Sequence, residues 1–597
     1  MVCDREGIGK GLARLLALCA VALLGGSPAA GQAVLFSHAG GFYADTFSLG
    51  MEVRYAPADS HYAIHYTLNG AEPTECDTRY TGPLPLTERC YSQAALYKVQ
   101  TVPDDRWFAP DEVEHIIVVR AAAFDSEGYR RSAVTTQAYL IDSLMHRRIS
   151  LPVVSLCADS LSLFDYDTGL FVMGYYHDPH LPYSTGNYFQ KGRMWERAAA
   201  MGYYEPDGGT LEQDCGLRVH GNSQRVLAQK GLSLYARSDY GEKSFRYPFF
   251  GHRKQNSYRR LVLRPWKTSW GASGVEDWLC QQIAEPLRCD NMANRPVVLF
   301  INGEYWGIYF LEEKADEHYV EEHHGVADEE VDLLAYWGEE VENGHVARWD
   351  SLYQWLQDAD LSREADYNYL ASQVDIDALI DYMLLQILVQ NDDWPVNNVR
   401  YWSAPERKWR WLFFDGDGAL CAMPKRSAIL DYVTYNVPRR STHTSLRATL
   451  LFRRLYGNAG FLQRTMERLR ELEETHFAYR NTSPHLQRIA QELEPEVPYQ
   501  IRRFDSPSSM AGWWAAVQVI DDFLRMEPAA MVEEYAQYFG LKEDPDRECE
   551  VTVYDPMGRE VLRRRARPSE LPFEGLPAGR YYVKLGNGET QKWRIGS

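Results

Sequence analysis

An apolar helix, followed by an acidic loop, a hairpin and a second acidic turn, is the feature that most restricts what this chain can fold into. Apolar residues recur at helical spacing through 375–390, behind a capping Asp at the first position. Pro395, inside the loop "NDDWPVNN" (391–398), forbids a regular continuation of that helix. Residues 399–414, "VRYWSAPERKWRWLFF", predict a β-hairpin, and "DGDG" (415–418) follows it directly. The chain therefore carries two acidic turns, one on each side of a predicted hairpin.

The first acidic turn has residue types and a spacing that phosphoryl transfer uses. One carboxylate must accept the proton of the attacking hydroxyl, while amide and carboxylate oxygens hold Mg²⁺ against the phosphates. In protein kinases the catalytic Asp precedes a metal-binding Asn by five residues. Asp393 and Asn398 have this spacing, and so do Asp392 and Asn397. The spacing leaves the choice of frame open.

The second acidic turn supplies the remaining metal ligands that this chemistry requires. Asp415 ends an apolar strand and precedes a Gly, as the metal-binding Asp of protein kinases does, and Asp417 would assist or replace it. The alternative is that all these residues serve only as turns and caps, which Asp, Asn and Gly favour in any case.

A turn and a lysine earlier in the chain offer groups that could bind phosphates. The turn "GNSQR" (221–225) includes Gly221 and Ser223, and Lys230 opens the predicted strand "KGLSLYA". Backbone N–H groups in such a turn and a lysine anchored on a strand can both pair with phosphates. Arg225 could add a bidentate contact. The alternative is that the lysine and the arginine are simply solvated beside a strand.

These turns, together with several further motifs in order, resemble the CotH kinase family, which is distantly related to protein kinases. The resemblance covers roughly residues 150–420. The motifs that carry it are "LPVVSLCADSLSLFDYDTGLFVMG", "MWERAAAMGYYEPDG", "LRVHGNSQRVLAQKGLSLYAR", "YRRLVLRPW", "FINGEYWGIYFLEEKADEHYVEEHHG" and the two acidic turns. Motifs that follow one another in the family's order are far more specific than any one of them.

The resemblance implies ATP as the phosphate donor, with Mg²⁺ or Mn²⁺ as the metal. It implies that Lys230 contacts the nucleotide phosphates, that Asp393 is the catalytic carboxylate, and that Asn398 and Asp415 hold the metal. It also implies a hinge at "GIYFLEEK", with Glu313 near the nucleotide. For Glu313 the alternative is an ordinary surface charge cluster.

Some positions depart from the family or stay undecided. Gln224 stands where a second small residue is expected, and "RPWKTSW" (264–270) is bulkier than the family's usual stretch. The acidic partner of the lysine cannot be read, although Glu276 and Asp277 open a predicted helix and are candidates. The stretch "EHYVEEHH" (317–324) lacks the His-Glu-x-x-His spacing of a zinc site.

The N-terminal part reads as an export signal followed by a β-module. Residues 1–31 combine basic residues, an apolar run too short to span a bilayer and a small-residue end, which predicts a signal peptide. Residues 32–145 contain short strands with turn signals, and "IHYTLNGAEPT" and "VRAAAFDSEGYRRS" resemble the fibronectin-III-associated module found beside chitobiase domains. Such a module implies an immunoglobulin-like β-sandwich that spaces or packs against its neighbour, with sugar binding as the alternative.

The C-terminal part, residues 548–597, has alternating strands of its own. "VYDPMGREV" and "LPAGRYYVKL" resemble the sorting domain that the type IX secretion system recognises. This resemblance implies a delivery address, and the alternative is a small β-domain packed on the body. Between the two flanking modules, residues 149–545 form the CotH kinase-like body.

Cysteine usage agrees with export. Ten cysteines are present, and removal of the signal peptide leaves an even number, which permits disulfides in an exported chain. Cys76 and Cys90 bracket a short loop and are the preferred pair, followed by Cys280 and Cys289.

The fold class predicted from these features is multidomain α+β. An N-terminal immunoglobulin-like β-sandwich, a central atypical protein-kinase-like α/β body and a C-terminal small β-sandwich follow one another. The net charge of −20 argues against general nucleic-acid binding, because no basic stripe is present to neutralise phosphates.

We expect export through the inner membrane to the cell surface or the medium, with no transmembrane anchor after processing. The expected partners are the type IX secretion machinery and a protein substrate outside the cell. The expected function is phosphate transfer from Mg-ATP to a protein hydroxyl. The alternative is a non-catalytic binding or structural protein of the surface, associated with carbohydrate or the envelope.

Overall fold

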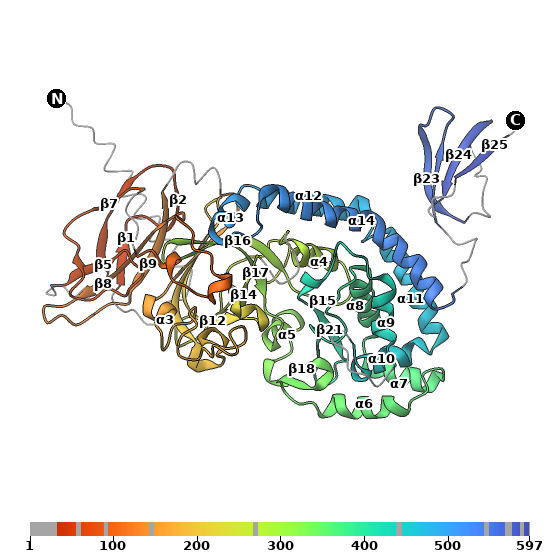
Figure 1. Cartoon of the computed structure of the whole chain (residues 1–597), viewed down its shortest axis with the longest axis horizontal. Helices are drawn as coiled ribbons and strands as arrows, with labels where there is room; N and C mark the ends of the chain where they lie inside the picture. The colour runs from red at the N-terminus through yellow and green to blue at the C-terminus, as the bar shows by residue number, and fades with distance from the viewer. Residues whose placement is uncertain are drawn as a thin grey trace. The chain divides into compact units, whose positions relative to one another are not determined.

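The computed structural model describes most of the chain in two compact units, residues 1–532 and 533–597 (Figure 1). The described residues are 33–54, 61–88, 94–141, 149–266, 273–436, 444–541, 549–567, 576–585 and 590–595. The predicted signal peptide and Cys90 lie outside them. Within these ranges, no helix combines the length and the apolar character needed to cross a membrane.

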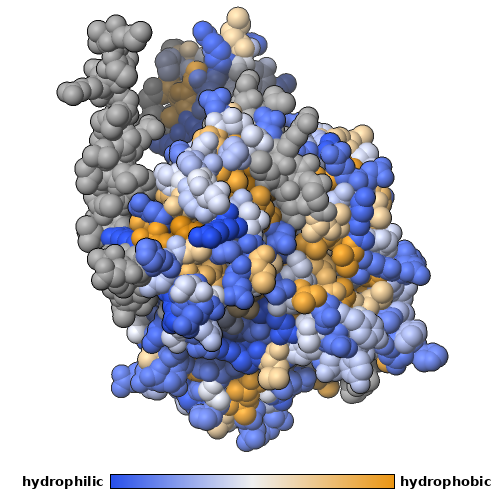
Figure 2. All heavy atoms as spheres, turned by 90° about the vertical axis from the view of Figure 1, so that its left-hand side faces the viewer, coloured by the Kyte–Doolittle hydropathy of each residue, from blue (hydrophilic) through white to orange (hydrophobic). Residues whose placement is uncertain are grey.

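The first part of the larger unit is rich in β-structure, as predicted. Its main sheet has the order β2 (Gly41–Tyr43), β9 (Thr135–Ile141), β8 (Ile117–Phe124), β5 (Ala63–Thr67) and β6 (Thr78–Arg79). Two pairs accompany it, β1 (Ala33–Phe36) with β4 (Met51–Arg54) and β3 (Phe47–Leu49) with β7 (Leu84–Leu86). Figure 2 looks onto this side of the molecule and shows hydrophilic residues over much of the surface, with small hydrophobic patches between them. The apolar residues of these strands are instead packed in one core that includes Val119 and Tyr139.

The central body begins with a closed barrel of seven strands. Their order around the barrel is β10 (Val153–Cys157), β11 (Arg197–Tyr204), β12 (Thr210–His220), β13 (Gly231–Tyr235), β14 (Arg260–Pro265), β17 (Glu304–Glu313) and β16 (Asn294–Ile301). Only β10 and β16 pair in parallel. The short helix α3 (Ser160–Phe164) follows β10. Sequence patterns predicted strands here but not their closure into a barrel, which depends on contacts between residues far apart in the chain.

A second sheet carries the predicted hairpin. Its order is β15 (Asp290–Asn291), β21 (Arg410–Phe413), β20 (Arg400–Ser403), β18 (Asp332–Ala335) and β19 (Glu340–Asn343). Antiparallel β20 and β21 are the two arms of that hairpin. The predicted helix before it is α8 (Ile376–Leu388), in which every residue except Asp377 is buried. The Asp375 side chain caps it by accepting a hydrogen bond from Ala378 N.

Helices surround this sheet and bridge it to the barrel. Helix α4 (Glu276–Ala284) contacts both β16 of the barrel and the turn after β21, and α12 packs on it (Figure 1). The other helices are α5 (Glu317–His324), α6 (Ala347–Asp358), α7 (Glu364–Gln373), α9 (Arg426–Thr434), α10 (Leu446–Tyr456), α11 (Ala459–Glu474), α12 (Tyr479–Leu493), α13 (Val497–Phe504) and α14 (Met510–Tyr538). From α10 onward, the described residues of this unit are mainly helical.

Buried polar bonds join the N-terminal β-module to the barrel. The Glu304 carboxylate on β17 is fully buried and accepts hydrogen bonds from Leu96 N and Tyr97 N, both at 2.7 Å. Lys230, next to β13, donates to Thr101 O at 3.0 Å. A buried carboxylate or ammonium group is stable only when it is hydrogen-bonded, so these contacts fix the module in one position on the barrel.

The smaller unit is an antiparallel sheet of four strands within its described residues. The order is β23 (Glu560–Ala566), β22 (Cys549–Tyr554), β24 (Gly579–Leu585) and β25 (Thr590–Ile595). Its core includes Val551, Val553 and Val583. The alternation of buried and exposed residues along β24 agrees with the strand pattern read from the sequence.

The cysteine pairing predicted for the body is wrong. Cys280 and Cys289 are both buried and both free. Cys280 lies within α4, where its sulfur approaches Gly416 O rather than a second sulfur. Cys76 is exposed and free, while its predicted partner lies outside the described residues.

Candidate functional site

The two acidic turns lie against each other. Asp392 N donates to Gly418 O at 3.2 Å, and Leu420 N donates to Val389 O at 2.9 Å, so backbone bonds tie the loop after α8 to the turn after β21. A Cβ atom on Gly418 would come within 2.9 Å of Asn391 Oδ1, closer than side chains normally approach. Glycine at this position therefore permits the close contact of the two turns.

Residues with a left-handed backbone conformation cluster at these turns. Gln390, Asn398, Asp415 and Leu420 have φ between 53° and 61°, a conformation that residues other than glycine seldom adopt. Such strain persists where surrounding contacts over-determine it, and it gathers at functional sites. Asn398 Nδ2 donates to Asp415 O at 3.5 Å, so the two predicted metal ligands are neighbours.

The surroundings of Asp392 and Asp393 differ. The Asp392 carboxylate forms an ion pair with Lys425, which precedes α9. The Asp393 carboxylate faces Gly418, where a Cβ atom would lie 3.5 Å from Oδ2. Asp393 therefore faces the second acidic turn, while the charge of Asp392 is engaged by a lysine.

A cluster of four carboxylates around Arg264, on strand β14, completes the site, and we call it the acidic centre. Arg264 Nη2 lies 2.6 Å from Asp415 Oδ1 and 3.5 Å from Asp417 Oδ2. Its Nε lies 3.8 Å from Asp277 Oδ2 and 3.7 Å from Glu312 Oε2. The barrel, α4 and the turn after β21 thus converge on one guanidinium.

Negative charge exceeds positive charge in the acidic centre. Burial raises the pKa of Asp415, but the neighbouring Arg264 outweighs it and lowers that pKa to about 2. Burial raises the pKa of Glu312 well above its usual value, so the surplus charge comes from the three aspartates, Asp277, Asp415 and Asp417, around the one arginine. Clustered carboxylate oxygens with surplus negative charge are what Mg²⁺ or Mn²⁺ binds. The residues therefore fit a divalent cation, which Asn398, Asp415 and Asp417 would hold.

The turn 221–225 reaches the acidic centre by its tip. Gln224 Nε2 donates to Asp417 Oδ2 at 3.5 Å, and the exposed Ser223 stands beside it. Arg225 turns the other way and donates to the carbonyl oxygens of Gly221, Tyr188, Gln190 and Val219. These bonds use four of its five N–H donors, so Arg225 braces the turn in this structure, whereas the sequence predicted a contact with phosphates.

The structure also gives Lys230 a place other than the predicted one. Its side chain is buried and donates to three carbonyl oxygens, of Thr101, Arg225 and Leu227, at 2.9–3.0 Å. The ring of Tyr188 lies 4.0 Å from Nζ. Because an ammonium group has three donors, none is left for a phosphate. Lys230 is therefore a structural anchor in this conformation.

Glu313, predicted to lie near the nucleotide, faces away from the acidic centre. Its carboxylate accepts from Ala293 N at 2.8 Å and lies 2.7 Å from His323 Nε2. Neighbouring residues of a strand point to opposite faces, so the adjacent Glu312 is the one that faces Arg264. The predicted residue, Glu313, and the residue that faces Arg264 therefore differ by one position along β17.

Sequence reasoning missed Arg264 and Glu312 and left Asp277 as one of two candidates. Asp277 Oδ1 also accepts a hydrogen bond from Gly416 N at 2.6 Å, so α4 holds the second acidic turn. The order of strand and helix in the sequence could have indicated Arg264 and Asp277. Arg264 lies near the end of the apolar strand "RLVLRP", and a helix with an acidic first turn follows; protein kinases place their lysine and glutamate ion pair in this order.

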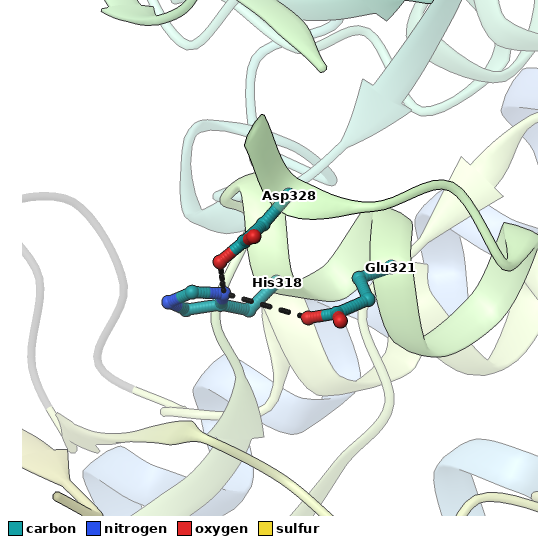
Figure 3. A group of neighbouring side chains, drawn as sticks. All are labelled: His318, Glu321 and Asp328. Carbon is teal, nitrogen blue, oxygen red and sulfur yellow. Dashed lines mark ion pairs between the residues drawn. The ribbon is translucent and has the colours of Figure 1, made fainter. Parts of the chain in front are cut away.

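A separate group of side chains, His318, Glu321 and Asp328, has the geometry of a metal site (Figure 3). His318 Nδ1 lies 3.2 Å from Asp328 Oδ2 and 3.9 Å from Glu321 Oε2. Arg259 already contacts both carboxylates, at 3.0 Å and 3.3 Å. The guanidinium supplies the positive charge there, so the group is explained as an ion-pair network.

Two family models match the chain. One describes the CotH kinase protein and matches residues 217–531, more than half of the 597 residues. The other describes the Fn3-associated domain and matches residues 57–139. A search of the curated proteins finds no match.

Proposed function

The chain belongs to the CotH kinase family, and on this premise we propose that it transfers a phosphoryl group from Mg-ATP to the hydroxyl of a protein. The observation that carries the proposal is the convergence of Asp393, Asn398, Asp415 and Asp417 on one partly buried site. Turns and caps alone do not require four such residues from two separate loops to meet.

In the proposed phosphoryl transfer, each residue of the site has a separate role. Asp393 accepts the proton of the attacking hydroxyl, since its carboxylate faces the second acidic turn at Gly418. When bound, Mg²⁺ supplies the positive charge that draws phosphate oxygens toward the carboxylates. Asn398, Asp415 and Asp417 present the oxygens that hold it. The phosphoryl group leaves the nucleotide and bonds to the hydroxyl oxygen, whose proton moves to the carboxylate.

Arg264 takes the role expected of Lys230 in this proposal. It is the cation at the acidic centre, and its planar guanidinium suits phosphate oxygens. Asp277 and Glu312 hold it in place from α4 and β17. Gly221 and Ser223 lie in the turn whose tip contacts Asp417 and so stand nearest to the nucleotide.

The test uses the purified chain, without its signal peptide, in ATP with Mg²⁺ or Mn²⁺. We expect phosphate incorporation into the chain or an added protein, detected by mass spectrometry, and a rise in melting temperature with the metal nucleotide. Asp393→Asn should lower the rate by about 10²–10⁴-fold, the usual worth of a general base. Asp392→Asn is the matched control and should lower it far less.

Two results would contradict the proposal in different ways. If the parent chain neither binds nor turns over the metal nucleotide, the protein is a non-catalytic member of its family. If activity is present but Asp392→Asn abolishes it and Asp393→Asn does not, the frame is wrong and Asp392 is the base.

We propose further that the protein acts outside the inner membrane, where its acceptor would be an exported or surface protein. The basic and apolar residues of 1–31 and the resemblance of 548–597 to a type IX sorting domain support this. Cell fractionation, with determination of both mature ends by mass spectrometry, checks it. A chain that keeps residues 1–31 and remains in the cytoplasm would contradict it.

A further inference from the structure

A cavity of about 520 Å³ lies behind helix α4, and we call it the α4 cavity. Its walls come from α4, from the start of β16, from α12 and from the segments around residues 151 and 250. The lining includes Trp278, Gln282, Asn294, Arg295, Arg488 and Glu492. The volume falls in the range of small-molecule binding sites in proteins.

The α4 cavity is distinct from the acidic centre. Trp278 and Gln282 line the cavity, whereas Asp277 on the same helix bonds to Gly416 N and approaches Arg264. Helix α4 thus separates the two sites and contributes to both.

Asn294 is an unusual group in the wall of this cavity. Its side chain is 2% exposed, and neither Oδ1 nor Nδ2 has a hydrogen-bond partner. A buried amide without partners costs about 1–3 kcal/mol, which native proteins rarely leave uncompensated. By contrast, the buried Asn291 nearby uses both groups, accepting from Arg253 and donating to Gln281 O.

The charged groups of the cavity are already compensated. Arg295 pairs with Glu205 at 2.7 Å, and Arg488 pairs with Glu492 at 3.0 Å and also donates to Gln282 Oε1. His252, which also lines the cavity, lies 3.7 Å from Glu285, so no surplus of one sign is left for an ion to neutralise. The occupant that complements these walls is a neutral molecule.

We propose that the α4 cavity binds a neutral, hydroxyl-rich ligand of the size of a sugar ring, and that Asn294 hydrogen-bonds to it. A hydroxyl group both donates and accepts, which matches the unused donor and acceptor of one amide. This site does not depend on phosphotransfer at the acidic centre.

The test is ligand-observed NMR on the full mature chain with glucose, galactose, mannose and N-acetylglucosamine, and with glucuronic acid as the charged counterpart. We expect at least one neutral sugar to bind, with a Kd on the order of 1 mM or tighter. Asn294→Leu should weaken binding at least tenfold and keep or raise the melting temperature, because it removes an unpartnered amide.

Two further variants separate binding from folding. Asn291→Leu, the matched control, should lower the melting temperature and leave the sugar affinity unchanged. Gln282→Ala, at a half-buried position of the cavity wall, should weaken binding in a chain that still folds. The proposal is overturned if no neutral sugar binds, if glucuronic acid binds better, or if Asn294→Leu binds like the parent.

Discussion

At the scale of the residue, the basic side chain at the acidic centre is Arg264 and not Lys230, to which the sequence gives the phosphate-binding role. Lys230 has the position in the family motif that implies phosphate binding, yet its three donors end on backbone carbonyls. Arg264 lies in a stretch that departs from the family, yet it meets Asp415 and Asp417. Residue type and motif were readable from the sequence, but which cation faces the carboxylates depends on how the strands close.

Lys230→Met should therefore impair folding and spare nucleotide binding. Removing the ammonium group leaves buried carbonyls without donors, at a cost of about 2–5 kcal/mol in the free energy of unfolding. Arg264→Lys keeps the charge but loses the planar fork, and should weaken Mg-ATP binding about tenfold or more. Chemical denaturation and calorimetric titration with Mg-ATP measure the two effects. If Lys230→Met weakens Mg-ATP binding and Arg264→Lys does not, Lys230 is the residue that binds the nucleotide.

At the scale of the element, the site depends on the fit between the loop after α8 and the turn after β21. The helix, the loop, the hairpin and the second turn were all predictable, because periodicity, Pro395 and Gly are local signals. The contribution of α4 was not, because Asp277 meets Gly416 only through the packing of α4 between β16 of the barrel and the turn after β21.

Gly418→Ala tests that fit. The added methyl group would lie 2.9 Å from Asn391 Oδ1, so the two turns must move apart by a few tenths of an ångström. We expect the phosphotransfer rate to fall at least tenfold, because small displacements of catalytic groups are costly, while stability falls by about 1 kcal/mol. Gly82→Ala, where nothing lies within 4 Å, is the matched control. Unchanged kinetics in Gly418→Ala would show that the turns are not coupled in catalysis.

At the scale of the whole molecule, the N-terminal β-module is docked on the barrel by buried polar groups. Glu304→Ala would leave the N–H groups of Leu96 and Tyr97 buried without an acceptor. We expect a loss of about 2–4 kcal/mol and easier proteolysis between module and barrel. Glu114→Ala, which removes an exposed ion pair with Arg502, should cost under about 1 kcal/mol. Calorimetry and limited proteolysis compare the two, and equal effects would mean that the buried carboxylate does not hold the module.

The sequence by itself determined the order of modules, the helix and hairpin around the acidic turns, and the family to which the body belongs. These rest on local signals, namely periodicity, turn residues and ordered motifs, which depend on residues close together in the chain. Only the tertiary structure decided that seven strands close into a barrel, that Glu312 rather than Glu313 faces Arg264, and that Arg264 rather than Lys230 meets the carboxylates. Those outcomes depend on strand register and on packing between distant segments, where a shift of one residue reverses the face of a side chain.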